Sequence, residues 1–363
     1  MSKKKICFIA QFPPPVHGLS KAVDTLYNSR LADEFEFEKV NITDNKNIIN
    51  NLILISRSKA DLFYFTISQT KVGNLRDLMI LKLLDMQKKK CLIHLHGGYY
   101  RQLVDYDMSS RQRKANYKAV SRLAGAVVLG ESLKSIFQGM LPESRIYTVA
   151  NCVDDEYLMS DEEFDEKTAM LAQRAVKHIL YLSNFIKSKG YPEVLEMAKL
   201  EKQRVESGSE RKFHFDFAGG FFEKAEEDYF RNYIKENSLE DYVTFYGIVQ
   251  GESKRALLKK CDIFVLLTRY TNEGQPISIL EAMGNGMVIL TTNHAGIPDI
   301  VKDGVNGILV DKNSIDVSSC LSRLLSINND IYRSIEKCNR NICKAYYSQN
   351  RYLDDMLNVY KIC

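Results

Sequence analysis

The chain has 363 residues, of which 45% are hydrophobic and 26% are charged, the balance of a soluble globular protein long enough for two buried cores. Its formal net charge of +4 is too small to indicate a nucleic-acid-binding protein. The apolar stretch near the basic N-terminus spans only five residues before three prolines, so it does not fit a signal peptide. No segment approaches the ~20 apolar residues of a membrane-spanning helix. We therefore expect a cytoplasmic protein whose membrane contact is at most peripheral.

Short β-rich runs alternate with longer helical patterns through the first half of the chain. The clearest helical patterns cover residues 19–31 and 74–89. The strand runs are continuously apolar, as expected for strands that helices cover on both faces. This order predicts a parallel, doubly wound α/β sheet. The expected strands are 5–10, 35–40, 61–66, 91–95, 125–129 and 145–149.

A second β/α series follows an acidic, helical stretch without a strand at residues 160–177, which we interpret as the connection between two domains. The final helical pattern, 348–362, carries an apolar face that is expected to pack against the first domain. We therefore predict two Rossmann-like domains, 1–165 and 175–345, the first completed by a C-terminal helix at 346–363. The strands expected in the second domain are 178–183, 213–219, 243–247, 262–267, 287–292 and 307–310.

Eight cysteines occur, none in a C-x-x-C pair and several inside apolar runs. Cysteine in such runs behaves as a small hydrophobic residue. The pattern indicates a reduced, cytosolic protein without a disulfide framework.

Basic residues concentrate between Tyr99 and Leu123. A solvated helix face would explain this concentration, and so would a surface for anionic lipid headgroups or a phosphorylated acceptor. The stretch contains two acidic residues, Asp105 and Asp107, and six basic ones: Arg101, Arg111, Arg113, Lys114, Lys118 and Arg122.

The most specific motif lies at residues 272–290, NEGQPISILEAMGNGMVIL. Glu273 precedes a turn with Gly274 and Pro276, and a helix is predicted over Ile277–Gly284, with proline in its first turn. The N–H groups at the start of such a helix, Ile277 among them, suit a diphosphate. Glu281, inside the helix, is placed to accept hydrogen bonds from a ribose diol. Glu273 is placed to reach a sugar.

This motif closely resembles the Glu-x7-Glu element of the retaining glycosyltransferase family four, and the resemblance continues through AGIPDIVKDGVNGILV at 295–310. It implies the GT-B fold, in which two Rossmann-like domains face one another across a cleft. It also implies sugar transfer from a nucleotide sugar without a metal or other cofactor. The family commonly has an aromatic residue and glycine where this chain has Gln275-Pro276, which leaves the donor sugar open.

A second stretch, ILYLSNFIKSKGYPEVLEMA at 179–198, resembles the loop in which the family grips the donor phosphates with an arginine and a lysine. Lys189 matches the lysine, whereas Asn184 occupies the usual arginine position. Without a metal, the charge that develops on the leaving phosphate must be neutralised by lysine and helix dipoles. We therefore assign this role to Lys189, with Lys187 in support; the alternative is a helix start with solvated lysines.

The loop after the first expected strand holds His17-Gly18, where the family commonly has two glycines. Gly18 would let the backbone approach a donor phosphate at the start of the next helix. In CLIHLHGGYY at 91–100, His94 and His96 share a face if the strand persists. His96 resembles the family's active-site histidine, which contacts the donor sugar. His94 fits an interior histidine with satisfied hydrogen bonds, and no third residue in a suitable motif completes a metal site.

Weaker matches complete the set. Gly219 and Gly220 resemble the family's glycine turn near the nucleobase, and Ile248 lies where the backbone contacts the base. Asn151 matches a turn at the domain join and is interpreted as structural. Glu131, in LGESLKSIF, resembles part of the family's Ser/Thr-x-x-x-Lys/Arg loop, which would allow a role in acceptor or sugar binding.

The resemblance implies front-face attack with retention of anomeric configuration, with His96, Glu273 and Lys189 as catalytic residues. By family frequency the donor is a UDP-sugar, and the acceptor is a saccharide or lipid-linked oligosaccharide of surface polysaccharide biosynthesis. A sugar-nucleotide epimerase or a phosphorylase can share the fold, and a non-catalytic carbohydrate-binding protein is a third alternative. An epimerase needs no acceptor, so product analysis separates it from a transferase.

Overall fold

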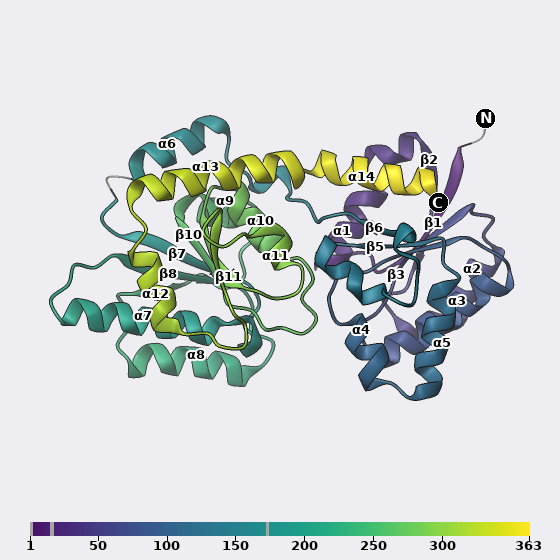
Figure 1. The fold of residues 1–363 in the computed structure, drawn as a ribbon, viewed down its shortest axis with the longest axis horizontal. Coiled ribbons are helices and arrows are strands. Elements are labelled where there is room, and N and C mark those ends of the chain that lie inside the picture. The colour runs from purple at the N-terminus through teal and green to yellow at the C-terminus, as the bar shows by residue number, and fades with distance from the viewer. Residues whose placement is uncertain (1–2, 15–17, 172–173) are drawn as a thin grey trace. The chain divides into compact units, whose positions relative to one another are not determined.

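The computed structural model describes residues 3–14, 18–171 and 174–363, and the chain splits into two compact units (Figure 1). The first consists of Met1–Asn151, Thr271–Gln275 and Asn350–Cys363, and the second of Cys152–Tyr270 and Pro276–Gln349. The five-residue segment 271–275 thus belongs to the first unit, although the chain on both sides of it belongs to the second. Each unit holds one parallel six-stranded sheet, which confirms the predicted α/β class.

The first sheet has the strand order β2-β1-β3-β4-β5-β6. Its inner strands are largely apolar because helices cover both faces, and all five residues of β3 are buried. The edge strand β2 instead has exposed charged residues, Glu36 and Lys39. The strands are β1 Lys4–Ala10, β2 Phe35–Asn41, β3 Leu62–Thr66, β4 Cys91–His94, β5 Gly125–Val128 and β6 Ile146–Thr148. The α-helices are α1 Gly18–Tyr27, α2 Ile48–Arg57, α3 Lys71–Met86, α4 Tyr100–Gln102, α5 Ser110–Ser121 and α14 Gln349–Ile362.

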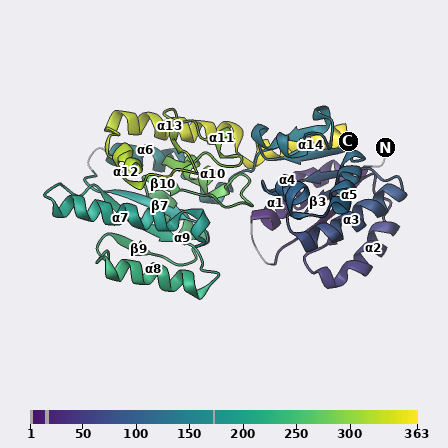
Figure 2. The same ribbon diagram turned by 60° about the horizontal axis from the view of Figure 1, so that its bottom comes forward.

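Helices α2, α3 and α5 cover the same face of this sheet. Crossovers between parallel strands are right-handed, and the chain moves across the sheet in one direction from β2 to β5. The three connecting helices therefore lie together, whereas α1, which joins β1 to β2 in the opposite direction, covers the other face. Both views show α2, α3 and α5 side by side (Figure 1, Figure 2).

The C-terminal helix α14 returns to the first sheet and buries the apolar face that its sequence shows. The Tyr360 ring lies 5.7 Å from that of Phe35 and 6.0 Å from that of Tyr64. Lys4 Nζ donates to the Tyr360 carbonyl at 2.8 Å. Residues 350–363 are therefore part of the core of the first unit.

The second sheet has the order β12-β11-β10-β7-β8-β9. Its strands are β7 Lys177–Leu182, β8 Phe213–Ala218, β9 Val243–Phe245, β10 Ile263–Leu266, β11 Val288–Thr292 and β12 Gly307–Val310. The longer helices of this unit are α6 Asp161–Leu171, α7 Tyr191–Glu206, α8 Lys224–Glu236, α9 Gly251–Lys260, α10 Ile277–Gly284, α12 Val317–Leu325 and α13 Asn329–Tyr346, with the short α11 Ile297–Ile300 between β11 and β12.

The acidic stretch expected to connect the domains forms α6, which packs onto the second unit. Lys167 is buried and donates to the carbonyls of Cys261 at 2.5 Å and Asn285 at 3.2 Å. Phe164 is also buried. An apolar stripe and one buried lysine thus attach this helix to the core of the second unit.

Among the described residues, no helix combines the length and the apolar run that a bilayer crossing requires.

Candidate active site

The second sheet has a topological switch point between β10 and β7. β7 pairs with β8 on one side and with β10 on the other. In open parallel sheets, ligands bind outside the carboxyl ends of the strands at such a point. Gly190, in the loop after β7, has a φ of +86°, and a Cβ there would lie 2.5 Å from the Leu267 carbonyl oxygen after β10. Only glycine allows these two loops to approach so closely.

Lys189 precedes this glycine in a short 3-10 turn, Lys187–Lys189, directly before the 16-residue helix α7. Its Nζ lies 5.1 Å from the centre of the Tyr270 ring, while Lys187 Nζ lies 5.2 Å from that of Tyr229. The Arg269 N–H donates to the Ser188 carbonyl at 2.6 Å and so joins the β10 loop to this turn. The cation that the sequence assigned to the donor phosphates thus stands at the switch point, at the positive end of a helix.

Asn184, Gly219 and Ile248 follow β7, β8 and β9 at the same edge of the sheet. Gly219 has a φ of +146°, and a Cβ there would overlap the Ser183 carbonyl oxygen. The Asn184 carbonyl accepts from Tyr181 Oη at 3.0 Å. Ile248 is 71% exposed, and its Cδ1 would lie 3.1 Å from a Cβ at position 220. These residues form an exposed apolar and backbone surface beside the switch point.

The helix α10 runs over Ile277–Gly284, which confirms its predicted bounds. Pro276 caps the helix, with ψ of 118°, instead of occupying its first turn as predicted. Glu281 Oε1 pairs with Lys254 Nζ at 2.6 Å, and both side chains are largely buried. Lys254 was not expected at the site, because nothing in the sequence of α9 sets it apart from its neighbouring lysines.

The segment 271–275 lies against the loop that follows β4. A Cβ on Gly274 would lie 2.6 Å from the His96 carbonyl oxygen, and one on Gly97 would lie 2.6 Å from the Asn272 carbonyl oxygen. Each glycine therefore lets the other loop approach to backbone contact. Glu273, which precedes Gly274 in this segment, is buried, with 8% of its surface exposed.

Gln275 fixes this segment through hydrogen bonds that use both ends of its side-chain amide. Its Oε1 accepts from the Asn151 N–H at 2.7 Å, and its Nε2 donates to the Leu129 carbonyl at 3.0 Å. The Asn151 Nδ2 donates to the Gln275 carbonyl at 2.9 Å. Gln275 was expected to contact the donor. In the structure, its side chain makes the hydrogen bonds that position segment 271–275. Asn151 has the structural role that the sequence suggested.

His94 and His96 lie on one side of the loop with ring centroids 3.9 Å apart, although β4 ends at His94. His94 Nδ1 pairs with Tyr64 Oη at 2.8 Å. His96 Nε2 is buried and has no hydrogen-bond partner among the described residues. Burial lowers the pKa of His96 to about 3 and also lowers that of His94. Both imidazoles are therefore neutral near pH 7, and His96 suits hydrogen bonding to a ligand better than proton abstraction.

The expected site residues thus fall into two groups. His96, Glu273, Gly274 and Gln275 lie together in the first unit, which also contains the exposed Gly18 at the start of α1. His17 lies outside the described residues. The group in the second unit consists of Asn184, Lys189, Gly219, Ile248, Pro276, Ile277 and Glu281.

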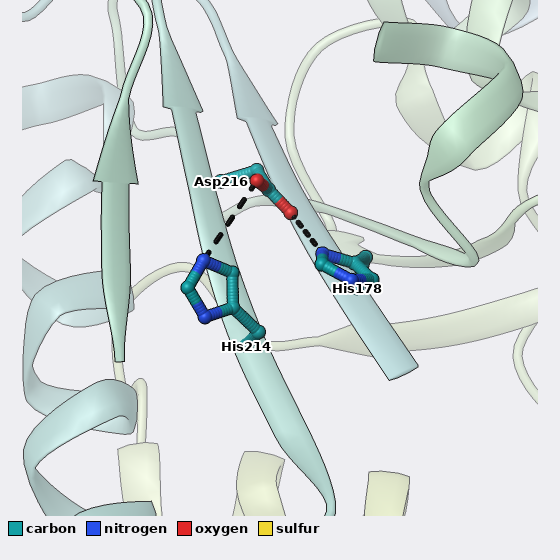
Figure 3. Close-up of side chains that lie close together, drawn as sticks. All are labelled: His178, His214 and Asp216. Atoms are coloured by element: carbon teal, nitrogen blue, oxygen red, sulfur yellow. Dashed lines mark hydrogen bonds and ion pairs between the residues drawn. The ribbon is translucent and has the colours of Figure 1, made fainter. Parts of the chain in front are cut away.

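A third cluster, His178, His214 and Asp216, has the composition of a metal site (Figure 3). Asp216 is buried and accepts from Lys260 Nζ at 2.9 Å, so a cation already balances its charge. Arg211 donates to His214 Nδ1 at 2.8 Å, which leaves the proton on Nε2, opposite Thr244 Oγ1 at 2.8 Å. His214 then has no free lone pair directed at the cluster. We interpret the cluster as a hydrogen-bond network near the amino ends of β7 and β8.

A comparison with protein families matches mainly residues of the second unit. Residues 164–342 match the profile of the family described as glycosyl transferases group 1. A putative colanic acid biosynthesis glycosyltransferase of Salmonella typhimurium is 30% identical over 135 residues, 35% of this chain and 33% of that protein. An uncharacterized glycosyltransferase of Methanocaldococcus jannaschii is 24% identical over 282 residues, 73% of this chain. The chain spans about a third of the length of the first relative and 66% of that of the second.

Solved structures resemble the whole chain. Anabaena HepE in complex with UDP superposes with a TM-score of 0.76 at 13% identity, covering 99% of this chain and 100% of the other. Sucrose-phosphate synthase from Thermosynechococcus elongatus gives 0.73 at 14% identity, covering 99% and 98%. These likenesses show the fold: two α/β units of the GT-B type, as predicted.

Proposed function

We propose that this chain, whose residues 164–342 match the family glycosyl transferases group 1, is a retaining glycosyltransferase. The donor is a nucleoside-diphosphate sugar, with UDP as the proposed nucleotide. The acceptor is a saccharide or a lipid-linked oligosaccharide of surface polysaccharide biosynthesis. Relatives described as colanic acid and amylovoran biosynthesis glycosyltransferases support that setting.

The observation that carries the proposal is the fixed segment 271–275. It is held by backbone contact to His96 and by Gln275, and it leads directly into α10. N–H groups in the first turn of a helix lack carbonyl partners within the helix and attract phosphate. Glu273 therefore stands four residues before a phosphate-binding helix start, in a segment that contacts the His96 backbone. This arrangement suits a sugar joined to a diphosphate.

We assign the diphosphate to Lys189, the start of α7 and the start of α10. When the bond from the anomeric carbon to the phosphate oxygen breaks, negative charge grows on the β-phosphate. Lys189 and the two helix ends oppose that charge, so the reaction is proposed to need no metal. Lys187 contributes less, because its Nζ lies over Tyr229 rather than over Tyr270.

We propose that the acceptor hydroxyl attacks the anomeric carbon from the face that the nucleotide leaves. A bond forms from the acceptor oxygen to that carbon, and the hydroxyl proton passes to the departing phosphate oxygen. Glu273 orients the sugar and stabilises its positive character in the transition state. His96, neutral near pH 7, hydrogen-bonds a sugar hydroxyl with the buried Nε2. No side chain is needed as a base.

The nucleoside is assigned to the surface beside the switch point. Gly219 and Ile248 form an apolar and backbone platform for the base, with the Asn184 turn next to it. Glu281 accepts the ribose hydroxyls, and Lys254 holds its carboxylate in place. HepE structures with UDP and with UDP-glucose share the fold, which supports uridine as the first nucleotide to test.

A thermal-shift series with UDP, GDP and dTDP sugars in EDTA tests the donor site. Selective stabilisation by the UDP series is expected, and Lys189→Ala should abolish it while Lys187→Ala retains it. Release of UDP must then depend on an added acceptor, since an epimerase or a hydrolytic side reaction would not require one. A nucleotide-binding protein that releases no UDP with any acceptor would instead support the non-catalytic alternative.

The basic stretch Arg101–Arg122 was the expected membrane contact, and it stays part of this proposal in a narrower form. Arg101 pairs with Asp105 at 3.1 Å, and Arg122 pairs with Asp85. The stretch also presents to solvent the four cations of α5: Arg111, Arg113, Lys114 and Lys118.

A further inference from the structure

Helices α2 and α3 expose an unusual amount of apolar side chain. Among the described residues, 17 large hydrophobic side chains are exposed, and seven of them lie on these two helices. Ile49 is 73% exposed, Met86 71% and Val72 69%. Scattered exposed apolar residues need no explanation, but a contiguous group marks an interaction surface.

The two helices enclose a groove between these side chains. Ile49 and Ile53 of α2 line one wall, and Met79 and Met86 of α3 line the other. Arg57 and Lys82 also line it, and both are exposed. We call Ile49, Ile53, Leu54, Val72, Leu75, Met79 and Met86 the apolar face. The helices that carry it, α2 and α3, lie beside α5 (Figure 2).

Every exposed charged residue on α2, α3 and α5 is basic. Helix α5, beside α3, has four basic residues and no acidic one. The exposed cations on α2 and α3 are Arg57, Lys71 and Lys82. The acids on these helices are already paired, Asp77 with the buried Arg76 and Asp85 with Arg122. A row of cations thus accompanies an apolar groove along three adjacent helices.

We propose that the apolar face is a docking surface for an anionic lipid bilayer. Apolar side chains would enter the boundary between headgroups and acyl chains, while the cations of α5, Arg57 and Lys82 contact the lipid phosphates. Two copies of the chain meeting through this face would bring the same cations together, which opposes self-association. Such docking would bring the first unit to the membrane that contains the proposed lipid-linked acceptor. The apolar face itself does not depend on the proposed donor chemistry.

Vesicle co-sedimentation tests the proposal with the full chain. Vesicles of phosphatidylcholine with phosphatidylglycerol should bind the protein, and vesicles of phosphatidylcholine alone should bind it weakly. The double variant Ile49→Ser/Met86→Ser should bind about tenfold more weakly, because it removes two of the most exposed apolar contacts. Lys82→Glu should weaken binding and reduce its dependence on salt. These side chains are exposed, so folding should be retained.

A matched control is Val305→Ser/Ile331→Ser, which removes two apolar side chains of the second unit that are 61% and 46% exposed. This control should bind vesicles like the unaltered protein. Equal vesicle binding by the Ile49→Ser/Met86→Ser variant would overturn the proposal. So would a dimer in sedimentation equilibrium that this variant dissociates, because a second copy would then occupy the face. Calorimetry with UDP on the same variant separates the two proposals, since nucleotide binding should be unchanged whether or not the membrane proposal holds.

Discussion

Gly274→Ala tests whether the contact between segment 271–275 and the His96 loop determines catalysis. The added methyl carbon would lie 2.6 Å from the His96 carbonyl oxygen and 3.0 Å from the Gly97 Cα. Both neighbours are backbone atoms, so no side-chain rotation relieves the overlap. The segment must move by several tenths of an ångström, and the hydrogen bonds that Gln275 makes to Asn151 and Leu129 must stretch with it.

The displacement should act mainly on the chemical step. Misplacing a reacting group by about 1 Å costs on the order of 10²-fold in rate, so we expect kcat to fall between tenfold and 10²-fold. KM for the donor should change little, because Lys189 and the start of α10 hold the diphosphate in the second unit. Strain on three buried hydrogen bonds predicts a loss of about 1–3 kcal/mol in the free energy of unfolding.

Steady-state kinetics and denaturant unfolding measure both effects, and Gly139→Ala is the matched control. Gly139 has a φ of +75° with open space around it, so alanine there introduces backbone strain of about 1 kcal/mol without moving the site. The control should lose stability and keep kcat. Unchanged kcat in a folded Gly274→Ala variant would refute the assignment of Glu273 and His96 to one reacting centre.

Three further predictions follow from single side chains. Lys189→Ala should lower kcat/KM for the donor by about 10²–10³-fold in EDTA, with Lys187→Ala losing less than about tenfold, as initial rates would show. The kcat profile should be flat across neutral pH with respect to His96, because burial lowers its pKa to about 3; an inflection near pH 6.5 that His96→Gln removes would contradict this. Burial raises the pKa of Glu336 from 4.5 to about 7, so stability from its protonated form is complete below pH 4.5 and is lost as the pH rises through 7. Glu336→Gln should therefore gain up to about 3 kcal/mol over the parent at pH 8 and nothing at pH 4, measured by urea unfolding at both values.

Local signals allowed much of the fold to be predicted. The α10 bounds followed from Pro276 ahead of an apolar helical run and from the glycines after it, and the apolar strands revealed two parallel sheets. What failed depends on contacts between distant residues. The amide of Gln275 is used by residues more than 120 positions earlier, and no spacing rule indicates that.

The same limit applies to the electrostatics and to the surface. Lys254 reaches Glu281 only because α9 and α10 are neighbours in the fold. The backbone contact between Gly274 and His96 joins residues far apart in the sequence, so no local pattern indicated it. Ile49, Ile53 and Leu54 are apolar but exposed, because α2 has the sheet on one side only. Amphipathic patterns indicate which residues are apolar, whereas the three-dimensional packing decides which of them are covered.

Calorimetric titration of the protein with UDP in EDTA tests the central claim most directly. The account predicts binding of one UDP per chain, retained without divalent metal and lost in Lys189→Ala but not in Lys187→Ala. Binding that requires a metal would contradict the assignment of phosphate neutralisation to Lys189 and the helix ends. Failure to bind UDP, GDP or dTDP would contradict the nucleotide-sugar site itself.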